Sequence, residues 1–248
     1  MTLPSIWFRK LALSACALLL AGTVLAQAPA APQASRESAL EKIFAAGLNS
    51  LRLVLVGIGS LGGGTDSTGV VWRVDIRNSE DRRIGIAGGF AWPVPSPNGQ
   101  AVFALRDRQV VRIAVSDGSE TPVGAPAEWR KLIGVAPDGT VLGFVEDDPR
   151  PRPALLEPGG DGRLVELPAP ADEGERKRNG LLLQDARDYA DGVRLEVRDS
   201  ERGGRGRDVF LVEGPKQRNL SNCGDDLCLQ PSRSIDGNYV FFIRASRP

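Results

Sequence analysis

The sequence predicts an all-β fold assembled from repeated four-stranded sheets. Two observations predict it directly: a tight turn followed by an apolar strand recurs four times, and strand–turn–strand hairpins lie between these repeats. A third observation agrees with them, because no convincing helical periodicity of ten or more residues follows Leu51. The chain is therefore expected to form one long β-rich domain.

The four repeated turns each end in an Asn-Gly or Asp-Gly pair. These pairs tolerate the positive φ angles of tight turns, and the runs that follow them are rich in β-branched and aromatic residues. The turn glycines are spaced by 40, 53 and 45 residues. The turns and their strands are Ser96-Pro97-Asn98-Gly99 before Ala101–Leu105, Ala136-Pro137-Asp138-Gly139 before Val141–Val145, Tyr189-Ala190-Asp191-Gly192 before Val193–Val197, and Ser234-Ile235-Asp236-Gly237 before Tyr239–Ile243.

A second kind of hairpin separates these repeats. Two hairpins in a period of about 40 to 50 residues make a four-stranded blade, which is typical of a β-propeller. We expect four blades, or an irregular five in which Leu51–Val56 supplies a spare strand, and an all-β sandwich is the alternative fold. The hairpins are Val70–Ile84, Val110–Val123, Ala154–Leu167 and Val209–Leu220, with turns at Asn78-Ser79, Asp117-Gly118, Asp161-Gly162 and Glu213-Gly214.

The order of the hairpins also predicts how the ring closes. The folded body begins with an outer hairpin at Val70–Ile84 and ends with an inner hairpin around Ser234–Gly237. The first strands could therefore complete the blade that the last strands begin. Such closure removes exposed sheet edges.

The N-terminal region has the pattern of a cleaved signal peptide. Arg9 and Lys10 precede the apolar run Leu11–Leu20, and Val24 and Ala26 occupy the two small-residue positions of a cleavage site. We therefore expect a signal peptide over 1–26 and a periplasmic or secreted protein. Beyond it we expect a flexible linker over 27–34, a short amphipathic helix over 35–47, and the propeller-like domain over 48–248.

Two alternatives concern the same N-terminal region. A membrane anchor is disfavoured because the unbroken apolar run is shorter than the ~20 residues that span a bilayer. A lipoprotein is the sharper alternative, since Leu13-Ser14-Ala15-Cys16 fits a lipobox. Only five residues, four of them apolar, lie between Lys10 and that cysteine, however, and the longer apolar run follows it.

The composition excludes several kinds of chemistry. The chain contains no histidine, which excludes Ser-His-Asp and Cys-His sites, histidine acid–base catalysis and histidine-ligated metals. Cleavage after Ala26 removes Arg9 and Lys10 from 31 basic residues and no residue from the 31 acidic ones, which leaves 29 against 31. This near-neutral balance disfavours a nucleic-acid partner.

Cleavage also removes Cys16 and leaves Cys223 and Cys228, which are separated by Gly-Asp-Asp-Leu. In an oxidising compartment such a pair is expected to form a disulfide that closes a short loop. A zinc site is the alternative, but two thiolates are only half of a tetrahedral ligand set.

Carboxylates and tryptophans are the remaining candidates for a site. The acidic clusters Glu146-Asp147-Asp148 and Asp225-Asp226 could serve glycoside hydrolysis or calcium binding, although no proton-donor partner can be identified for them. Trp72, Trp92 and Trp129 lie beside or within strands, where we expect them to pack between blades rather than to stack on sugars.

Two glycine-rich segments resemble known motifs but lack the required context. Gly57-Ile58-Gly59-Ser60-Leu61-Gly62 follows a strand, yet no helix follows to hold a pyrophosphate. Arg202–Arg207 resembles an RNA-binding segment and is interpreted as a mobile hairpin tip. We therefore assign no catalytic, metal-binding or cofactor-binding residue, and no cofactor.

The repeats between Phe90 and Arg244 resemble those of the TolB-like, WD-like β-propeller family, whose turns carry Ser-Pro-Asp-Gly before an apolar strand. Ser96–Gly99 and Ala136–Gly139 are the closest matches, and no counterpart of TolB's preceding α/β domain is recognised. By analogy with such folds, we expect an exported, non-enzymatic binding or scaffold module whose partner is an envelope or secreted protein or ligand. The alternative is a carboxylate-dependent hydrolase that acts on a glycan.

Overall fold

The computed structural model describes residues 68–146, 152–157, 164–166, 173, 187–189, 191–201 and 205–247. The described part forms sixteen strands, and none of its residues belongs to a helix long and apolar enough to cross a membrane. The expected signal peptide, linker, N-terminal helix, spare strand and Gly57–Gly62 loop all lie outside the described residues, as does the lipobox cysteine Cys16.

The described strands form two four-stranded antiparallel sheets and one eight-stranded sheet. In the larger sheet, a single parallel pair, Arg207↔Leu227 of β13 and β15, joins two antiparallel groups of four strands, so the predicted architecture of four-stranded, propeller-like blades is confirmed. Blade one is β3 (Ala91–Pro95), β4 (Ala101–Arg106), β5 (Gln109–Ala114) and β6 (Glu120–Val123). Blade two is β7 (Trp129–Val135), β8 (Val141–Val145), β9 (Arg152–Leu156) and β10 (Leu164–Glu166). Blade three is β11 (Arg187–Asp188), β12 (Val193–Asp199), β13 (Arg207–Glu213) and β14 (Lys216–Asn219). Blade four is β15 (Leu227–Arg233), β16 (Tyr239–Ala245), β1 (Val70–Asp75) and β2 (Asp81–Ile84).

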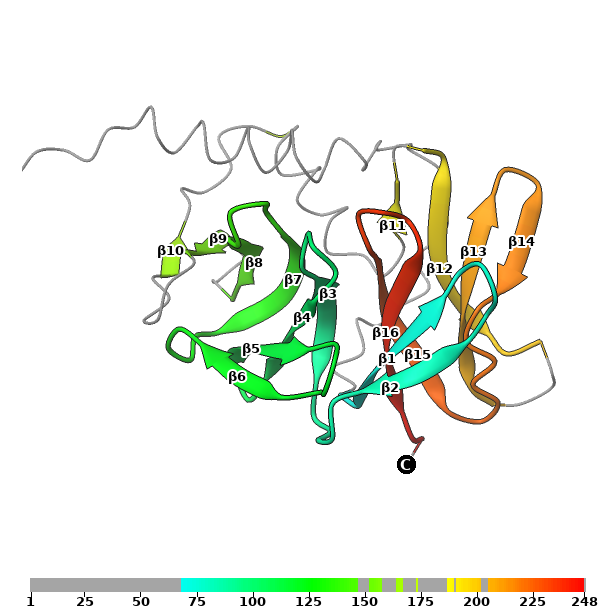
Figure 1. Cartoon of the computed structure of the whole chain (residues 1–248), viewed down its shortest axis with the longest axis horizontal. Coiled ribbons are helices and arrows are strands. Elements are labelled where there is room, and N and C mark those ends of the chain that lie inside the picture. Colours follow the sequence, from blue (N-terminus) through cyan, green and yellow to red (C-terminus); the bar gives the residue numbers. More distant parts are fainter. Residues whose placement is uncertain are drawn as a thin grey trace, which may run out of the picture.

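Blade four is built from both ends of the described chain. β1 pairs with β16 in antiparallel register from Val70↔Arg244 to Asp75↔Tyr239. Figure 1 shows these two strands side by side, one near the start of the colour scale and the other at its end. The predicted closure, in which the first outer hairpin completes the last blade, is therefore present.

Hydrophobic cores lie between neighbouring blades. On β16, Phe241 and Ile243 pack toward blade one, whereas Val240 and Phe242 pack toward blade three. All four side chains are at most 1% exposed. Because both faces of this strand are buried, its sequence is a continuous apolar run instead of an alternating one.

Polar contacts between the inner strands connect the remaining blades. The Arg187 guanidinium of β11 donates to the carbonyls of Ile133 and Leu132 on β7, at 3.0 and 3.2 Å. Tyr189 follows β11 directly, and its hydroxyl oxygen accepts the backbone N–H of Arg233 on β15 at 2.8 Å. Blade three therefore contacts both blade two and blade four.

The four repeated turns share one hydrogen-bond pattern. In each, the glycine N–H donates to the carbonyl of the first turn residue, and the Asn or Asp side chain accepts the backbone N–H two residues later. The glycines have φ angles of 68°, 89°, 81° and 73°, which favour glycine over residues with a Cβ. The turns that lack proline keep this geometry because the Asp side chain and the glycine maintain it.

The serine at the start of two of these turns is expected to contribute about 1 kcal/mol to the free energy of unfolding. Ser234 Oγ accepts the Tyr239 N–H at 2.9 Å, and Ser96 Oγ accepts the Ala101 N–H at 3.0 Å. Urea unfolding should show similar losses for Ser234→Ala and Ser96→Ala. The exposed Ser116→Ala serves as the control, and a loss in the control as large as in the turn variants would contradict the assignment.

Candidate functional site

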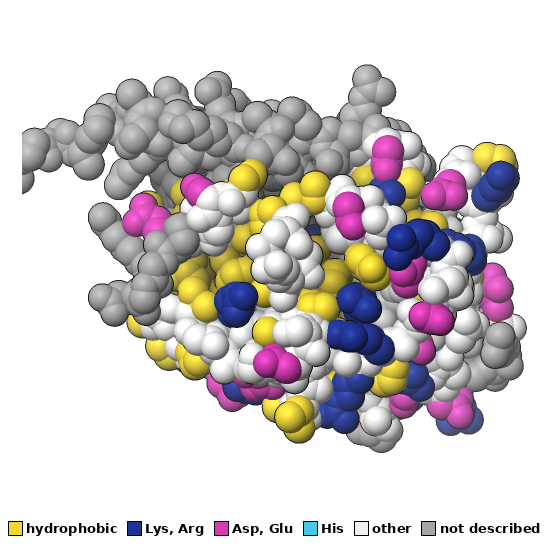
Figure 2. Space-filling model, viewed as in Figure 1, with side chains coloured by type: hydrophobic (Ala, Val, Ile, Leu, Met, Phe, Trp, Pro, Cys, Tyr) yellow, Lys and Arg dark blue, Asp and Glu magenta, His cyan; other side chains and the backbone are white. Residues whose placement is uncertain are grey.

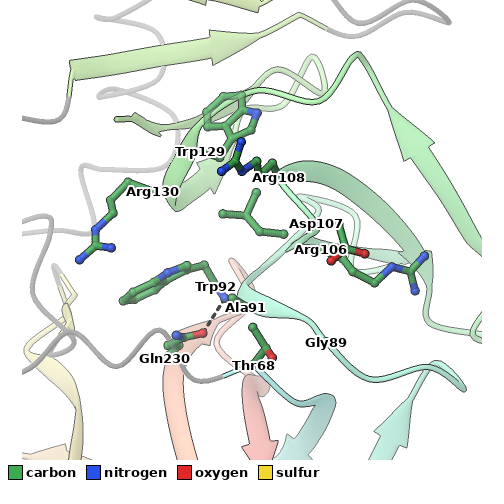
Figure 3. Close-up of a pocket in the computed structure, with 11 residues that line it drawn as sticks. Thr68, Gly89, Ala91, Trp92, Arg106, Asp107, Arg108, Trp129, Arg130 and Gln230 are labelled. Atoms are coloured by element: carbon green, nitrogen blue, oxygen red, sulfur yellow. Dashed lines mark hydrogen bonds between the residues drawn. The ribbon is translucent and has the colours of Figure 1, made fainter. Parts of the chain in front are cut away.

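A cleft of about 180 Å³ opens where β3 and β7 begin and where β4 meets β5. Its lining residues come from blades one, two and four. In the view of Figure 3, Trp129 lies above the cleft and Trp92 below it. The lining residues are Thr68, Gly89, Ala91, Trp92, Leu105, Arg106, Asp107, Arg108, Trp129, Arg130 and Gln230.

Bulges in two inner strands place Trp92 and Gln230 at the cleft. The register of β3 shifts between Ala91 and Val94, and that of β15 shifts between Leu229 and Ser232. Trp92 and Gln230 have φ angles of 53° and 55°, a left-handed conformation that is uncommon for residues with a Cβ. The Trp92 N–H donates to Gln230 Oε1 at 2.7 Å, the dashed contact of Figure 3, and this bond joins blade one to blade four.

A two-residue turn between β4 and β5 forms one wall. Asp107 and Arg108 have φ angles of 50° and 63°, as a type I′ hairpin turn requires. The Ala127 N–H donates to the Arg108 carbonyl at 2.8 Å, which fixes the turn against the loop that leads into β7. The exposed Arg108 guanidinium pairs with Glu128 at 2.6 Å.

Three arginines lie at the rim of the cleft, and each is ion-paired with a glutamate outside its lining. Arg106 pairs with Glu120 at 2.6 Å and lies 4.8 Å from the centroid of the Phe90 ring. Arg130 Nε is 4.0 Å from the Glu146 carboxylate. Among the described residues that line the cleft, Asp107 is the only one with a carboxylate. The cleft therefore brings together aromatic, cationic and amide groups and does not place two carboxylates across a substrate.

The three described tryptophans all have a ring face in contact with the protein. Lys131 Nζ lies 4.3 Å from the Trp92 centroid, and the Arg244 guanidinium carbon lies 5.3 Å from the Trp72 centroid. A Cβ atom added to Gly143 would lie 2.8 Å from ring atom Cζ3 of Trp129, so that ring rests on the backbone of β8. These contacts stabilise the packing of the blades, and any ligand that stacks on Trp92 must use its other face.

The acidic clusters are not part of this cleft. Asp226 accepts from Arg244 Nε at 2.8 Å, and Asp225 accepts from the Arg205 N–H at 3.2 Å. Glu146 is exposed after β8, while Asp147 and Asp148 lie outside the described residues. Within the described ranges, no three Cys, Asp or Glu side chains are grouped as a metal site would need.

Cys223 and Cys228 form a disulfide, with their Cα atoms 6.2 Å apart. It links the segment after β14 to β15 and therefore joins the outer strand of blade three to the inner strand of blade four. A disulfide is typical of proteins that fold in an oxidising compartment.

The prediction that Arg202–Arg207 joins two strands of a hairpin is confirmed, because Asp199 of β12 pairs with Arg207 of β13, but its description as a mobile tip is wrong for Gly206 and Arg207. Arg207 begins β13, and Gly206 is buried. A Cβ atom on Gly206 would lie 2.2 Å from the Gly224 carbonyl oxygen and 2.3 Å from that of Asp226. The glycine permits this close approach of two backbones. Residues 202–204 lie outside the described part.

The sequence analysis missed most of the cleft residues. The Asp107-Arg108 turn had a detectable signal, because four polar residues, Arg106 to Gln109, separate two largely apolar runs. Gln230 had none, since its position depends on a bulge that the sequence pattern does not reveal.

No family model matches the sequence, and no curated protein matches it. Among solved structures, a putative TolB from Agrobacterium tumefaciens is 18% identical with a TM-score of 0.34, and the match covers 71% of this chain and 62% of that one. TolB from Acinetobacter baumannii is 12% identical with a TM-score of 0.35, over 72% and 49% of the two chains. The β-propeller domain of the Trilobed protease from Pyrococcus furiosus is 12% identical with a TM-score of 0.26, over 73% and 69%. The matched region therefore spans 62% and 49% of the two TolB chains.

Proposed function

We propose that this chain is an exported, non-enzymatic β-propeller module that binds an envelope or secreted protein. Its binding surface is the end of the ring that carries the cleft between Trp92 and Trp129. The observation that carries the proposal is the make-up of this cleft, in which tryptophan and arginine side chains surround a cavity with a single carboxylate. Tryptophan and arginine are the residue types most enriched at the energetic centres of protein interfaces.

A neighbouring loop supplies an exposed apolar contact. Ile86 is 82% exposed and lies between β2 and β3, in the loop whose Gly89 lines the cleft. An isoleucine this exposed gains free energy when a partner covers it. The Arg83 guanidinium donates to the Ile86 carbonyl, which holds the loop against β2.

Export is supported by two independent features. The Cys223–Cys228 disulfide suits an oxidising compartment, and residues 1–26 have the pattern of a signal peptide. A glycan hydrolase would need a second carboxylate opposite Asp107, about 5 to 10 Å away. The described lining of the cleft offers none.

Affinity capture with the full purified chain tests the proposal. The immobilised protein is incubated with a cell-envelope extract, and the retained proteins are identified by mass spectrometry. Ile86→Asp and Arg108→Glu alter exposed side chains at the cleft, whereas Lys216→Glu makes the same charge reversal on the exposed outer strand β14. We expect a protein that the wild type and Lys216→Glu retain and that both cleft variants lose on the order of ten-fold, because each substitution removes about 1.4 kcal/mol or more of binding free energy.

Two outcomes would contradict the proposal: no protein is retained above background, or the cleft variants retain it as well as Lys216→Glu does. Release of reducing sugars from envelope glycans by the wild type would instead support the hydrolase.

A further inference from the structure

Two arginines face each other across the first hairpin. Arg73 on β1 and Arg82 on β2 are direct cross-strand partners in the register of the sheet. Like charges in this position are destabilising, because the Cβ atoms of such partners are only about 5 Å apart. An anion bound between Arg73 and Arg82 would relieve the repulsion between their positive charges.

The two guanidinium groups contact an aromatic ring and a backbone carbonyl. The Arg73 guanidinium carbon lies 4.5 Å from the centroid of the Tyr239 ring, and Arg82 donates to the backbone carbonyl of Val115 on blade one. Neither arginine forms an ion pair with a carboxylate of the described residues. Burial lowers the pKa of Arg73 and the positive charge of Arg82 lowers it further, while Tyr239 and Asp75 oppose these two effects.

The carboxylate next to this pair is already engaged. Asp75 lies on β1 and accepts from Arg77 Nε at 3.0 Å and from Arg77 Nη2 at 2.6 Å. The bonds from Arg77 lower the pKa of Asp75 to about 2, so this carboxylate is ionised at neutral pH. Asp75 is therefore hydrogen-bonded to Arg77 and acts on Arg73 only through space, and neither Arg73 nor Arg82 forms a direct ion pair with it.

The pair lies where blade four meets blade one. The bond from Arg82 to Val115 crosses the boundary between the blades, and the Tyr239 ring packs partly against the core between them. Figure 2 shows Lys and Arg side chains gathered over β1 and β2, beside a region of hydrophobic side chains. The ring contact orients the Arg73 guanidinium, so less conformational entropy is lost when it binds an anion.

We propose that Arg73 and Arg82 bind an oxyanion of the phosphate class at the boundary between blades one and four. Guanidinium groups donate parallel N–H bonds to phosphate, and the several oxygens of one phosphate can accept from two guanidiniums at once. A phosphate monoester carries about −1.5 to −2 charges near neutral pH, which matches the two unpaired arginines. This site is separate from the cleft and does not depend on its role.

Thermal melts of the full chain in inorganic phosphate test the site. Phosphate is titrated against sodium chloride at equal ionic strength, and the shift of Tm gives the affinity. Arg73→Gln and Arg82→Gln are compared with Arg112→Gln, which removes one exposed charge from β5. We expect both site variants to bind phosphate about ten-fold more weakly or worse, because each loses one of the two guanidinium groups that donate to the anion, while Arg112→Gln binds as the wild type does.

A second readout uses vesicles in place of thermal melting. Sedimentation with vesicles of phosphatidic acid, a phosphomonoester lipid, against vesicles of phosphatidylcholine identifies the source of the phosphate. Vesicle binding that needs Arg73 and Arg82 supports a lipid headgroup, whereas binding of inorganic phosphate alone supports a soluble phosphate. A wild-type Tm that phosphate raises no more than chloride does, together with no vesicle binding, would overturn the proposal, as would equal binding by all three variants.

Discussion

Phe241→Ala is expected to lower the free energy of unfolding by about 3 to 5 kcal/mol, the usual cost of deleting a buried phenylalanine side chain. Phe241 is 1% exposed and lies on β16, the strand between β15 and β1. Its ring fills the core between blades four and one, together with Val71 and Ile113. Removal would leave a cavity where the first strand of the described chain meets the last. Urea unfolding followed by circular dichroism measures the loss.

Two further variants separate this cavity effect from a general effect of substitution. Phe241→Leu keeps much of the volume and should cost roughly 1.5 kcal/mol or less. Ile235→Ala changes a side chain that is 57% exposed in the neighbouring turn, and should stay within about 0.5 kcal/mol of the wild type. If Phe241→Ala were no more destabilised than Ile235→Ala, the closure of blade four by β1 and β16 would be wrong.

Asp208→Ala is expected to cost about 3 kcal/mol or more, because it leaves several buried donors without an acceptor. Asp208 is 1% exposed. One of its oxygens accepts the Cys223 N–H at 2.6 Å and the Ser221 hydroxyl at 3.2 Å, and the other accepts from Asn219 Nδ2 at 2.8 Å. The carboxylate thus orders the segment between β14 and the disulfide.

Conservative variants test whether the hydrogen bonds carry this effect. Asp208→Asn keeps one acceptor oxygen for the Cys223 N–H but turns an NH₂ group toward Asn219, so its loss should be intermediate. Ser221→Ala removes one hydroxyl and should cost about 1 kcal/mol. Chemical unfolding with the disulfide intact compares the three variants. Equal losses for Asp208→Ala and Asp208→Asn would show that packing, and not the acceptor, stabilises this segment.

Much of the fold could be predicted from the sequence because its signals are local. The four turns were identified by an Asn or Asp followed by glycine, and the structure shows that these two residues make the shared hydrogen bonds even where proline is missing. The closure of blade four followed from the order of the hairpins. The turns depend on information within a few residues, which is where turn chemistry acts, whereas the closure depends on the order of the hairpins along the whole chain.

The cleft could not be predicted because its residues are brought together by irregularities. Trp92 and Gln230 meet only because β3 and β15 each carry a bulge, and one extra residue changes which side chains face the cleft. The pairing of Arg73 with Arg82 likewise depends on the register of one hairpin. The hairpin was predicted, but a shift of a single residue would have placed either arginine opposite a different partner.

The pairing of β1 with β16 also determines when, during synthesis, the first hairpin can complete its sheet. Val71 lies opposite Ile243, and at a synthesis rate of about 5 to 20 residues per second roughly 10 to 30 seconds pass between the appearance of these two partners. Throughout that interval the inner edge of β1 has no partner strand, and unpaired strand edges make a chain prone to aggregate. Contacts between such distant residues also slow folding. A chain that must remain unfolded until it has crossed a membrane would benefit from this slower folding.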